Sequence, residues 1–251
     1  MITKTEIKLI NSLSIKKYRE INNLFIVEGN KIVDEIIESD YKIKYLIHTE
    51  KYNPPKFNSA EKTIQTNIET IKKISNFKTA PSVVALVVLK YNQLIINNLK
   101  NKLTLAIDEI QDPGNLGTIV RICDWFGIEN IICSENSVDI YNPKVIQASM
   151  GAFLRVNVFY KNLENFIIEY KKQTENICYG AFLDGQSIYD VNKNENSLLV
   201  MGNEGNGISE SIENLIESKI FIPPYFSNGK HSESLNLSVA TAIVCNEFRK
   251  K

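Results

Sequence analysis

The stretch LLVMGNEGNGIS, residues 198–209, runs an apolar segment directly into three glycines and then into a helix start. A short apolar run that ends in a polar loop is typical of a strand in a parallel sheet. Ligands of such sheets lie beyond the carboxyl ends of the strands. Taken alone, the stretch leaves three interpretations open: a phosphate cradle, a cofactor loop, or a turn that only reverses the chain.

The two phosphate-binding interpretations fail on individual residues. A P-loop needs a lysine directly after its last glycine, and Ile208 stands at that position. A dinucleotide-binding fingerprint would need a further glycine at the position of Glu210. Glu204, inside the loop, would also repel a polyphosphate at close range. The loop therefore suits a neutral or cationic ligand better than a phosphorylated one.

Strands and helices alternate along most of the chain, and this alternation predicts an α/β fold. Towards the N-terminus we expect a helix through residues 7–13, strands at 24–27, 43–48 and 83–91, and helices at 30–39 and around 64–74. Further along we expect strands at 103–110, 130–133, 155–160, 177–182, 197–202 and 219–224, and helices at 118–126, 143–150, 162–173, 209–217 and 237–249. Strands separated by helices predict a parallel sheet covered on both faces. An Asn-rich stretch separates the two parts, so we predict domains at 1–92 and 103–251 with a linker at 93–102.

Composition excludes some classes of protein. The 251 residues are 43% hydrophobic, which predicts a globular protein, and 29 basic residues balance 29 acidic ones. The first 90 residues hold 15 basic against 10 acidic residues, a split compatible with nucleic-acid binding or with an ordinary solvated surface. Scattered cysteines, with two histidines in the chain, predict neither a metal site nor disulfides, and no apolar run is long enough for a membrane span. We expect a cytoplasmic protein.

Two more polar loops follow predicted strands. In IDEIQDPGNLGTIVRICDWFGI, residues 107–128, Arg121 lies off the apolar stripe of the following helix. Its guanidinium is either a bidentate ligand of a phosphate or carboxylate, or an ordinary exposed helix arginine. In residues 219–248, a strand stops at Pro223, and Ser234 and Asn236 precede a helix. Ser234 is the expected helix N-cap, and Asn236 is a candidate ligand contact.

Together the three loops resemble the three motifs of the SpoU, or TrmH, family of RNA ribose methyltransferases within the SPOUT class. The matching residues are Asn115, Gly117 and Arg121 for NxGxxxR, Gly202, Glu204 and Gly207 for GxExxG, and Ile222, Pro223, Ser234, Leu235, Asn236, Ser238, Val239 and Ala240 for IP followed by SLNxSVA. The motifs cover residues 103–251, and the front of the chain resembles the family's accessory RNA-binding domain. Loop 226–233, FSNGKHSE, departs from the commonest family wording, so the resemblance assigns it no role.

The resemblance implies a parallel-sheet SPOUT domain with a deep C-terminal trefoil knot, preceded by a smaller α/β domain similar to RNA-binding ribosomal proteins. It implies S-adenosylmethionine as cofactor, methyl transfer to a ribose 2′-hydroxyl, and a homodimer. The implied cofactor contacts are Met201, Gly202, Gly205, Ile222, Pro223 and Leu235. The implied catalytic group is Arg121, Asn115, Glu204, Ser234 and Asn236.

The family resemblance proposes Arg121 as the base that deprotonates the hydroxyl. Because a guanidinium pKa above about 12 makes neutral arginine scarce, we expect instead that Arg121 holds the adjacent phosphate and stabilises the developing alkoxide. The resemblance of the front of the chain to the accessory RNA-binding domain implies ribosomal RNA rather than transfer RNA as substrate. The alternatives are a transfer RNA 2′-O-methyltransferase, a base methyltransferase, and a non-catalytic RNA-binding factor in ribosome assembly.

Overall fold

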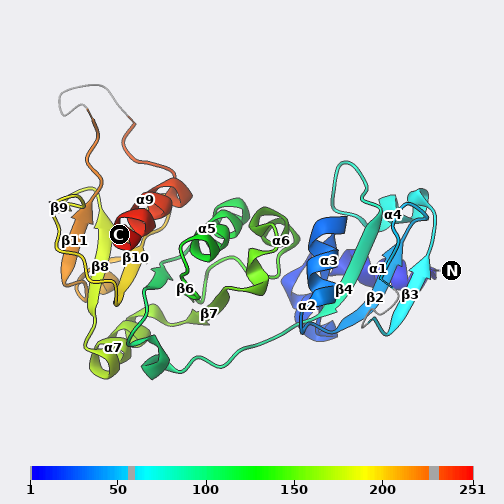
Figure 1. Cartoon of the computed structure of the whole chain (residues 1–251), viewed down its shortest axis with the longest axis horizontal. Coiled ribbons are helices and arrows are strands. Elements are labelled where there is room, and N and C mark those ends of the chain that lie inside the picture. Colours follow the sequence, from blue (N-terminus) through cyan, green and yellow to red (C-terminus); the bar gives the residue numbers. More distant parts are fainter. Residues whose placement is uncertain (1, 56–59, 226–231, 251) are drawn as a thin grey trace. The chain divides into compact units, whose positions relative to one another are not determined.

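The structure is a computed structural model that describes residues 2–55, 60–225 and 232–250 (Figure 1). The chain divides into two compact units. The first comprises Met1–Tyr91 together with Asp139–Leu154, and the second comprises Asn92–Val138 and Arg155–Lys251. Nothing in the sequence pattern signalled that residues 139–154 pack with the first unit. The domain boundary at 93–102 stays a prediction.

The first unit is built on a four-stranded mixed sheet. Its strands are β1 (Leu24–Glu28), β2 (Ile43–His48), β3 (Lys62–Gln65) and β4 (Val83–Val88), in the order β1-β4-β2-β3. Strand β4 is antiparallel to β1 and β2, while β3 is parallel to β2. Helices α1 (Lys4–Ser12) and α4 (Ile68–Ile74) share one hydrophobic core with this sheet, and α2 (Lys16–Asn22) and α3 (Asn30–Glu38) complete the N-terminal part of the unit.

The helix expected around residues 64–74 is wrong, because this stretch holds two elements, β3 and α4. In β3 only Ile64 is buried, so the strand is too short to show a period. Asn67 accepts a hydrogen bond from the Thr70 backbone N–H and caps α4, which starts the helix there. The short spacing between Ile64 and Ile68 made two elements resemble one.

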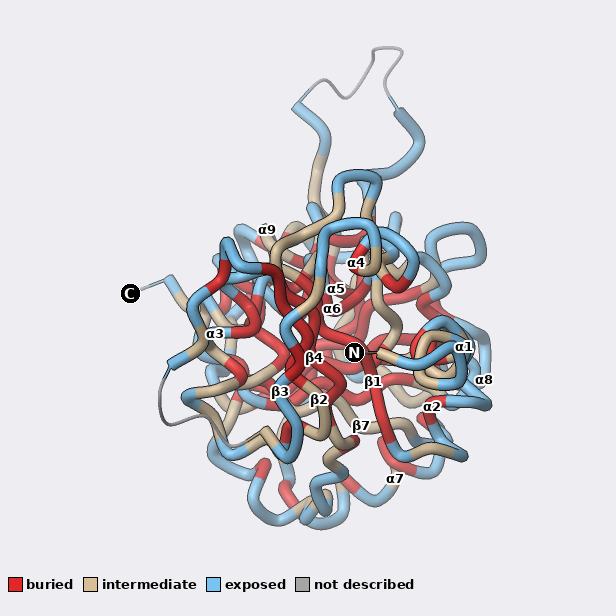
Figure 2. Tube along the Cα trace, turned by 90° about the vertical axis from the view of Figure 1, so that its right-hand side faces the viewer, coloured by how far each residue is buried: buried red, intermediate tan, exposed pale blue. Residues whose placement is uncertain are grey.

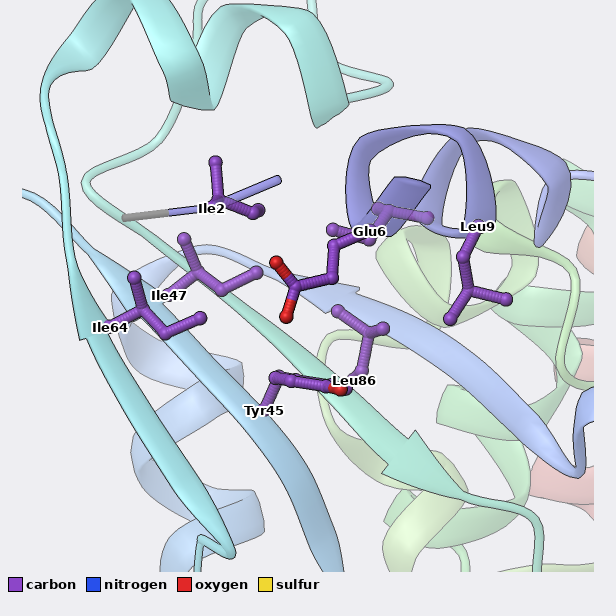
Figure 3. Close-up of a pocket in the computed structure, with 8 residues that line it drawn as sticks. Ile2, Glu6, Leu9, Tyr45, Ile47, Ile64 and Leu86 are labelled. Carbon is purple, nitrogen blue, oxygen red and sulfur yellow. The ribbon is translucent and has the colours of Figure 1, made fainter. Parts of the chain in front are cut away.

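Glu6 on α1 closes a small apolar depression over the sheet (Figure 3). Its carboxylate accepts hydrogen bonds from the Thr3 backbone N–H at 2.7 Å and from the Lys62 ammonium at 2.9 Å. Thr3 in return accepts from the Glu6 backbone N–H, which completes a capping box at the start of α1. These contacts, the Thr3 backbone bond first, lower the pKa of Glu6 to about 2.

Glu6→Gln is expected to destabilise the protein in a pH-dependent way. The folded pKa of Glu6 lies below the ordinary glutamate value of 4.5, so its contribution is fully present above pH 4.5 and is lost as the pH falls towards about 2. Because the pair with Lys62 is partly exposed, we expect a loss of less than about 1 kcal/mol at neutral pH. Chemical denaturation of both proteins between pH 7 and pH 2 measures the difference. A difference that stays constant down to pH 2 would contradict this account.

Segment 139–154 completes the hydrophobic packing of the first unit. It contains α6 (Pro143–Ser149) and a short 3-10 turn, η2 (Ala152–Leu154), and α6 packs against the edge strand β1. Phe25 of β1 lies in ring contact with Tyr141 at 4.6 Å and with Phe153 at 6.0 Å between centroids. The face of β1 that carries Phe25 is therefore covered by residues that lie far along the chain.

A buried ion pair anchors this segment. Arg19 of α2 is 2% exposed, and its guanidinium donates to Asp139 Oδ2 through Nε at 3.0 Å and through Nη2 at 2.5 Å. Nη1 donates to the carbonyl oxygens of Leu13 and Ser14 at 2.9 and 3.0 Å. The guanidinium is thus held on two sides, which a lysine could not reproduce.

The second unit contains a seven-stranded sheet in the order β7-β6-β5-β10-β8-β11-β9. Its strands are β5 (Thr104–Ile107), β6 (Asn130–Ser134), β7 (Asn157–Lys161), β8 (Ile177–Phe182), β9 (Gln186–Ser187), β10 (Ser197–Met201) and β11 (Ser218–Phe221). Every pairing is parallel, which confirms the predicted parallel sheet. The sequence did not indicate β9, because two residues carry no periodic pattern. The implied trefoil knot stays a prediction.

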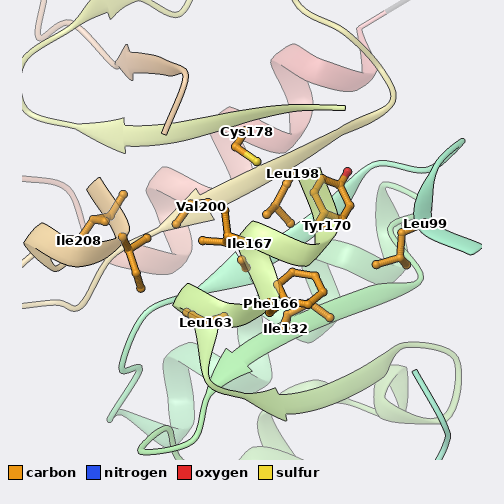
Figure 4. Packing of buried hydrophobic residues seen from close by; sticks show 12 residues of the cluster. Leu99, Ile132, Leu163, Phe166, Ile167, Tyr170, Cys178, Leu198, Val200 and Ile208 are labelled. Atoms are coloured by element: carbon orange, nitrogen blue, oxygen red, sulfur yellow. The ribbon is translucent and has the colours of Figure 1, made fainter. Parts of the chain in front are cut away.

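Helices cover both faces of this sheet. Residues of α7 (Leu163–Thr174) pack with alternate strand residues such as Ala106, Ile132 and Leu198 in one cluster (Figure 4). On the other face α5 (Pro113–Trp125) packs with α9 (Leu237–Arg249), whose Phe248 ring contacts Tyr179 of β8 at 4.9 Å. A short turn, η1 (Ile96–Leu99), and α8 (Glu210–Glu213) complete the unit. In Figure 2 buried residues, in red, follow the strands and the inner sides of the helices.

Three helix boundaries are informative. Helix α9 matches the predicted range 237–249, whereas α5 begins at Pro113, five residues before the predicted start. Asp112 caps α5 and a proline at the first position favours a helix start, signals that outweigh the two glycines that follow. Helix α8 is one turn long where a helix over residues 209–217 was expected.

Across the described residues, no helix combines the length and apolar character needed to cross a lipid bilayer.

Candidate functional site

The loops after β5 and β10 leave the sheet side by side. The two strands are parallel neighbours with Met201 opposite Ile107, and the Asp108 N–H donates to the Met201 carbonyl at 2.9 Å. The carboxyl ends of both strands therefore open onto one edge of the sheet, where ligands of parallel sheets bind.

Three side chains, one from each motif, form a continuous chain of hydrogen bonds. Asn236 Nδ2 donates to Asn115 Oδ1 at 3.0 Å, and Asn115 Nδ2 donates to Glu204 Oε1 at 3.0 Å. The direction of this chain follows from its first member, because Asn236 Oδ1 already accepts from the backbone N–H and the hydroxyl of Ser238. All donors therefore point towards the Glu204 carboxylate.

Helix capping places the two asparagines. Asp112 Oδ1 accepts from the Asn115 N–H at 2.7 Å, so Asn115 lies in the first turn of α5 and not in the loop where we expected it. Asn236 caps α9 through its side chain, so the expected N-cap role of Ser234 is wrong. Asn236 lies two residues closer to α9 than Ser234 does, so its side chain can accept directly from the first free backbone N–H groups of the helix. Ser234 makes no side-chain hydrogen bond within the described part of the chain, and its catalytic role stays a prediction.

The glycine loop folds back on its own backbone. Asn203 and Gly207 exchange two backbone hydrogen bonds at 2.8 and 3.1 Å, and Asn203 Oδ1 accepts from the N–H groups of Gly205 and Asn206. A Cβ at Gly202 would lie 2.2 Å from the carbonyl carbon of Gly207, so only glycine fits. Gly207 itself has φ +70°. The sequence contained this signal, since both positions belong to the GxExxG motif.

The other residues implied for cofactor binding lie at the carboxyl ends of β10 and β11 and just before α9. Met201 is buried in β10 and Gly205 is exposed, while Ile222 and Pro223 are half-buried after β11. Leu235 is 49% exposed just before α9. Most of the loop 226–233, to which no role was assigned, lies outside the described residues.

These residues fit S-adenosylmethionine. The missing side chain at Gly202 lets the Gly207 backbone pack against it, which gives the loop its compact shape, and exposed Leu235 offers an apolar surface for a base. Glu204 in the loop tolerates a cationic ligand, and the loop 202–208 holds no lysine or arginine for a phosphate.

Arg121 lies apart from the hydrogen-bonded chain. It follows Asn115 by six residues on α5, which places it about 120° around the helix and about 9 Å along its axis. Its side chain is exposed and has no hydrogen bond or ion pair with the residues described. Thr118 and Trp125 are exposed at the same helical phase, so Arg121 belongs to an outward stripe of α5. Its predicted catalytic role is not tested by this arrangement.

Two residues that hold the site were missed by sequence reasoning, Asp108 and Asn203. Asp108 is buried and its Oδ2 accepts from the Ser209 N–H at 2.9 Å. Asn203 Nδ2 donates to the Glu109 carbonyl at 2.7 Å. An Asp directly after an apolar strand and an Asn two residues before a glycine were the available signals.

Comparison with known proteins identifies the family. Residues 102–246 match the profile of the SpoU rRNA methylase family. The chain belongs to this family. Residues 4–85 match the MRM3-like substrate-binding domain. Membership of the SpoU family confirms the resemblance inferred from the three motifs and the predicted enzyme class, an S-adenosylmethionine-dependent RNA methyltransferase.

Relatives span nearly the whole chain. The chain is 25% identical over 245 residues to the 23S rRNA (guanosine(2553)-2′-O)-methyltransferase RlmP of Bacillus subtilis, covering 97% of this chain and 96% of that protein. Among solved structures, a TrmH-family protein from Porphyromonas gingivalis has a TM-score of 0.86 at 36% identity and covers 100% and 99% of the two chains. An AdoMet-bound rRNA methyltransferase from Sinorhizobium meliloti has a TM-score of 0.84 at 25% identity, covering 100% and 96%. Both solved structures also confirm the predicted α/β fold class with its parallel sheet.

Proposed function

We propose that this protein transfers a methyl group from S-adenosylmethionine to a ribose 2′-hydroxyl in ribosomal RNA. The observation that carries the proposal is the hydrogen-bonded chain from Asn236 through Asn115 to Glu204, because it joins all three family motifs at one sheet edge. The Bacillus subtilis and Sinorhizobium meliloti relatives, both named as ribosomal RNA methyltransferases, support ribosomal RNA as the substrate class. The cytoplasm, where bacterial ribosomal RNA is made, is the proposed location.

Each part of the site has a proposed task. When bound, S-adenosylmethionine supplies an electrophilic methyl group on a sulfonium. The backbone of the glycine loop, with Met201, Ile222, Pro223 and Leu235 around it, holds the cofactor. Asn115 and Asn236 orient Glu204, whose second carboxylate oxygen can hydrogen-bond the target ribose. Arg121 binds the neighbouring phosphate and stabilises the negative charge that develops as the hydroxyl proton leaves. Alignment of the reacting groups supplies most of the remaining acceleration.

The position of Arg121 supports a homodimeric site. Trp125 is 85% exposed on the same stripe of α5, and Val239 is 48% exposed on α9, the helix that packs beside it. The two helices run in the same direction, because Asn236 bonds Asn115 at their starts and Arg249 bonds the Phe126 carbonyl at their ends, so Val239 and Trp125 lie towards opposite ends of this face. A tryptophan this exposed is typical of a protein interface. In a dimer through this face, Arg121 of one subunit would reach the cofactor site of the other. The deep knot implied by the family would then lie next to the interface.

Trp125→Glu is expected to convert the dimer into a monomer at micromolar concentration. Placing a carboxylate at the centre of an apolar interface removes a tryptophan anchor, which raises the dimer dissociation constant by about 100-fold or more. Sedimentation equilibrium measures the change in mass. Tyr189→Glu, a change at another exposed aromatic residue of the second unit, is the matched control and should leave the mass unchanged. Equal masses for wild type and Trp125→Glu would refute an interface on this face.

Maps of 2′-O-methylation test the function itself. We expect one ribosomal RNA nucleotide to lose its 2′-O-methyl group, and with it resistance to alkaline hydrolysis on its 3′ side, in cells without the gene. Loss in transfer RNA alone would favour the first alternative. Loss of a methyl group without loss of alkaline resistance would favour base methylation. No loss, together with no cofactor binding by the purified protein, would favour a non-catalytic assembly factor.

A further inference from the structure

Asp108 closes the glycine loop at both ends. Its backbone N–H donates to the carbonyl of Met201, where the loop starts, and its carboxylate accepts from the N–H of Ser209, where the loop stops, both at 2.9 Å. Asp108 is 5% exposed and forms no ion pair with any described residue. A buried carboxylate is costly unless hydrogen bonds offset its desolvation, and the Ser209 N–H is the partner that the structure gives the Asp108 carboxylate.

Asn203 makes a second connection inside the loop. Its Oδ1 accepts from the N–H groups of Gly205 and Asn206, and its Nδ2 donates to the Glu109 carbonyl at 2.7 Å. Glu109 is a non-glycine residue with φ +52°, and its own N–H donates to Ser134 Oγ at 2.7 Å. Such a backbone conformation is unfavourable and persists where surrounding contacts hold it. The glycine loop is thus tied through Asn203 to Glu109, whose backbone is fixed both by this bond to its carbonyl and by the bond of its N–H to Ser134.

These ties order a segment that glycine makes flexible. Gly202, Gly205 and Gly207 lose more backbone entropy on ordering than other residues would. If the loop were loose in the free protein, cofactor binding would have to supply this free energy. Contacts made before binding remove that cost from the binding step.

We propose that Asp108 and Asn203 are positioning residues that hold the glycine loop in its cofactor-binding shape before the cofactor binds. The inference rests on the proposed function, because it concerns the loop assigned to S-adenosylmethionine. Asp108 acts as a hydrogen-bond acceptor for Ser209, so its charge is dispensable while its oxygen is not. An asparagine at the same position presents an equivalent acceptor, whereas alanine presents none.

Titration calorimetry of the full chain with S-adenosylmethionine tests the proposal. Asp108→Ala is expected to weaken binding by about 10-fold or more, corresponding to about 1.4 kcal/mol, while Asp108→Asn stays within about 3-fold of wild type. In steady-state assays the KM for the cofactor should rise in Asp108→Ala and kcat at saturating cofactor should change less than about 3-fold. Wild-type affinity in Asp108→Ala, or equal losses in both variants, would overturn the proposed role of Asp108.

Asn203→Ala provides a second test that does not depend on a buried position. It removes the bonds to Glu109 and to the loop N–H groups, and we expect at least about 5-fold weaker cofactor binding. Asn162→Ala is the matched control: Asn162 caps α7 by accepting from the Asn165 N–H at 3.0 Å and lies outside the three motifs. If Asp108→Ala does not fold, the comparison of Asn203→Ala with Asn162→Ala decides, and equal affinities would refute the inference.

The wild-type protein separates this inference from the proposed function. A wild-type chain that binds no S-adenosylmethionine would refute the proposed function together with the inference. A wild-type chain that binds the cofactor, with unchanged affinity in Asp108→Ala and Asn203→Ala, would leave the proposed function standing and overturn only the positioning role.

Discussion

Arg121→Ala is expected to reduce methyl transfer by about 100- to 1000-fold and to leave S-adenosylmethionine affinity within a few-fold of wild type. The arginine is proposed to stabilise charge that appears only as the 2′-hydroxyl loses its proton, so its loss should lower kcat more than it weakens the cofactor complex. Its exposed position on α5, away from the glycine loop, agrees with an undisturbed cofactor site. Single-turnover transfer of a labelled methyl group to ribosomal RNA measures the first quantity, and calorimetry measures the second.

Two further variants sharpen this result. Arg121→Lys keeps a positive charge but loses the bidentate geometry, so intermediate activity is expected if the arginine holds a phosphate. Arg155→Ala removes another exposed arginine of the same unit, one paired with Asp124 at 2.9 Å, and should retain wild-type activity. Substantial activity of Arg121→Ala on the true RNA substrate would show that neither the base role nor the stabilising role is correct.

Arg19→Leu is expected to lower the free energy of unfolding of the first unit by about 3–5 kcal/mol. The substitution leaves the Asp139 carboxylate, 14% exposed, without its cation, and leaves the carbonyls of Leu13 and Ser14 without a donor. Hydrogen exchange of the β1 amide protons in increasing urea reports the stability of this unit directly, even if the two units unfold separately.

The double variant Arg19→Leu with Asp139→Asn distinguishes a buried charge from lost packing. If the unpaired carboxylate causes most of the loss, the double variant should be more stable than Arg19→Leu alone. Arg155→Leu, which breaks the exposed pair with Asp124, serves as the control and should cost less than about 1 kcal/mol. A loss for Arg19→Leu no larger than this control would contradict the importance assigned to the buried pair.

Sequence patterns predicted the sheet of the second unit well, because strands such as 197–201 are continuous apolar runs bounded by polar loops. Helix α9 was predicted at its observed limits, since a polar segment precedes a clear apolar face. Short elements escaped prediction: β3 buries one residue and β9 has two residues. The start of α5 was missed because Gly114 and Asn115 looked like loop residues, although Asp112 and Pro113 favour a helix start.

The candidate site was predictable in its loops but not in its contacts. The sequence placed Asn115, Glu204 and Asn236 in three loops at strand ends. It did not show their hydrogen bonds, because Asn236 Nδ2 donates to Asn115 only as a result of Asn236 Oδ1 being engaged in capping α9. Asp108 escaped notice because a single carboxylate after a strand carries no pattern. The return of residues 139–154 to the first unit depends on packing between distant segments, which local periodicity does not encode.

That return has a consequence for the order of events during protein synthesis. A ribosome that has completed residue 91 has made every strand of the first sheet, yet Tyr141 and Phe153, which cover Phe25, follow 50 and 62 residues later. At about 5–20 residues per second the nascent sheet exposes the apolar surface around Phe25 for several seconds, a period in which chaperones or neighbouring nascent chains can bind it. The first unit therefore matures only after residues 92–138 of the second unit have been translated, and gene fragments that stop near residue 91 should yield an aggregation-prone product.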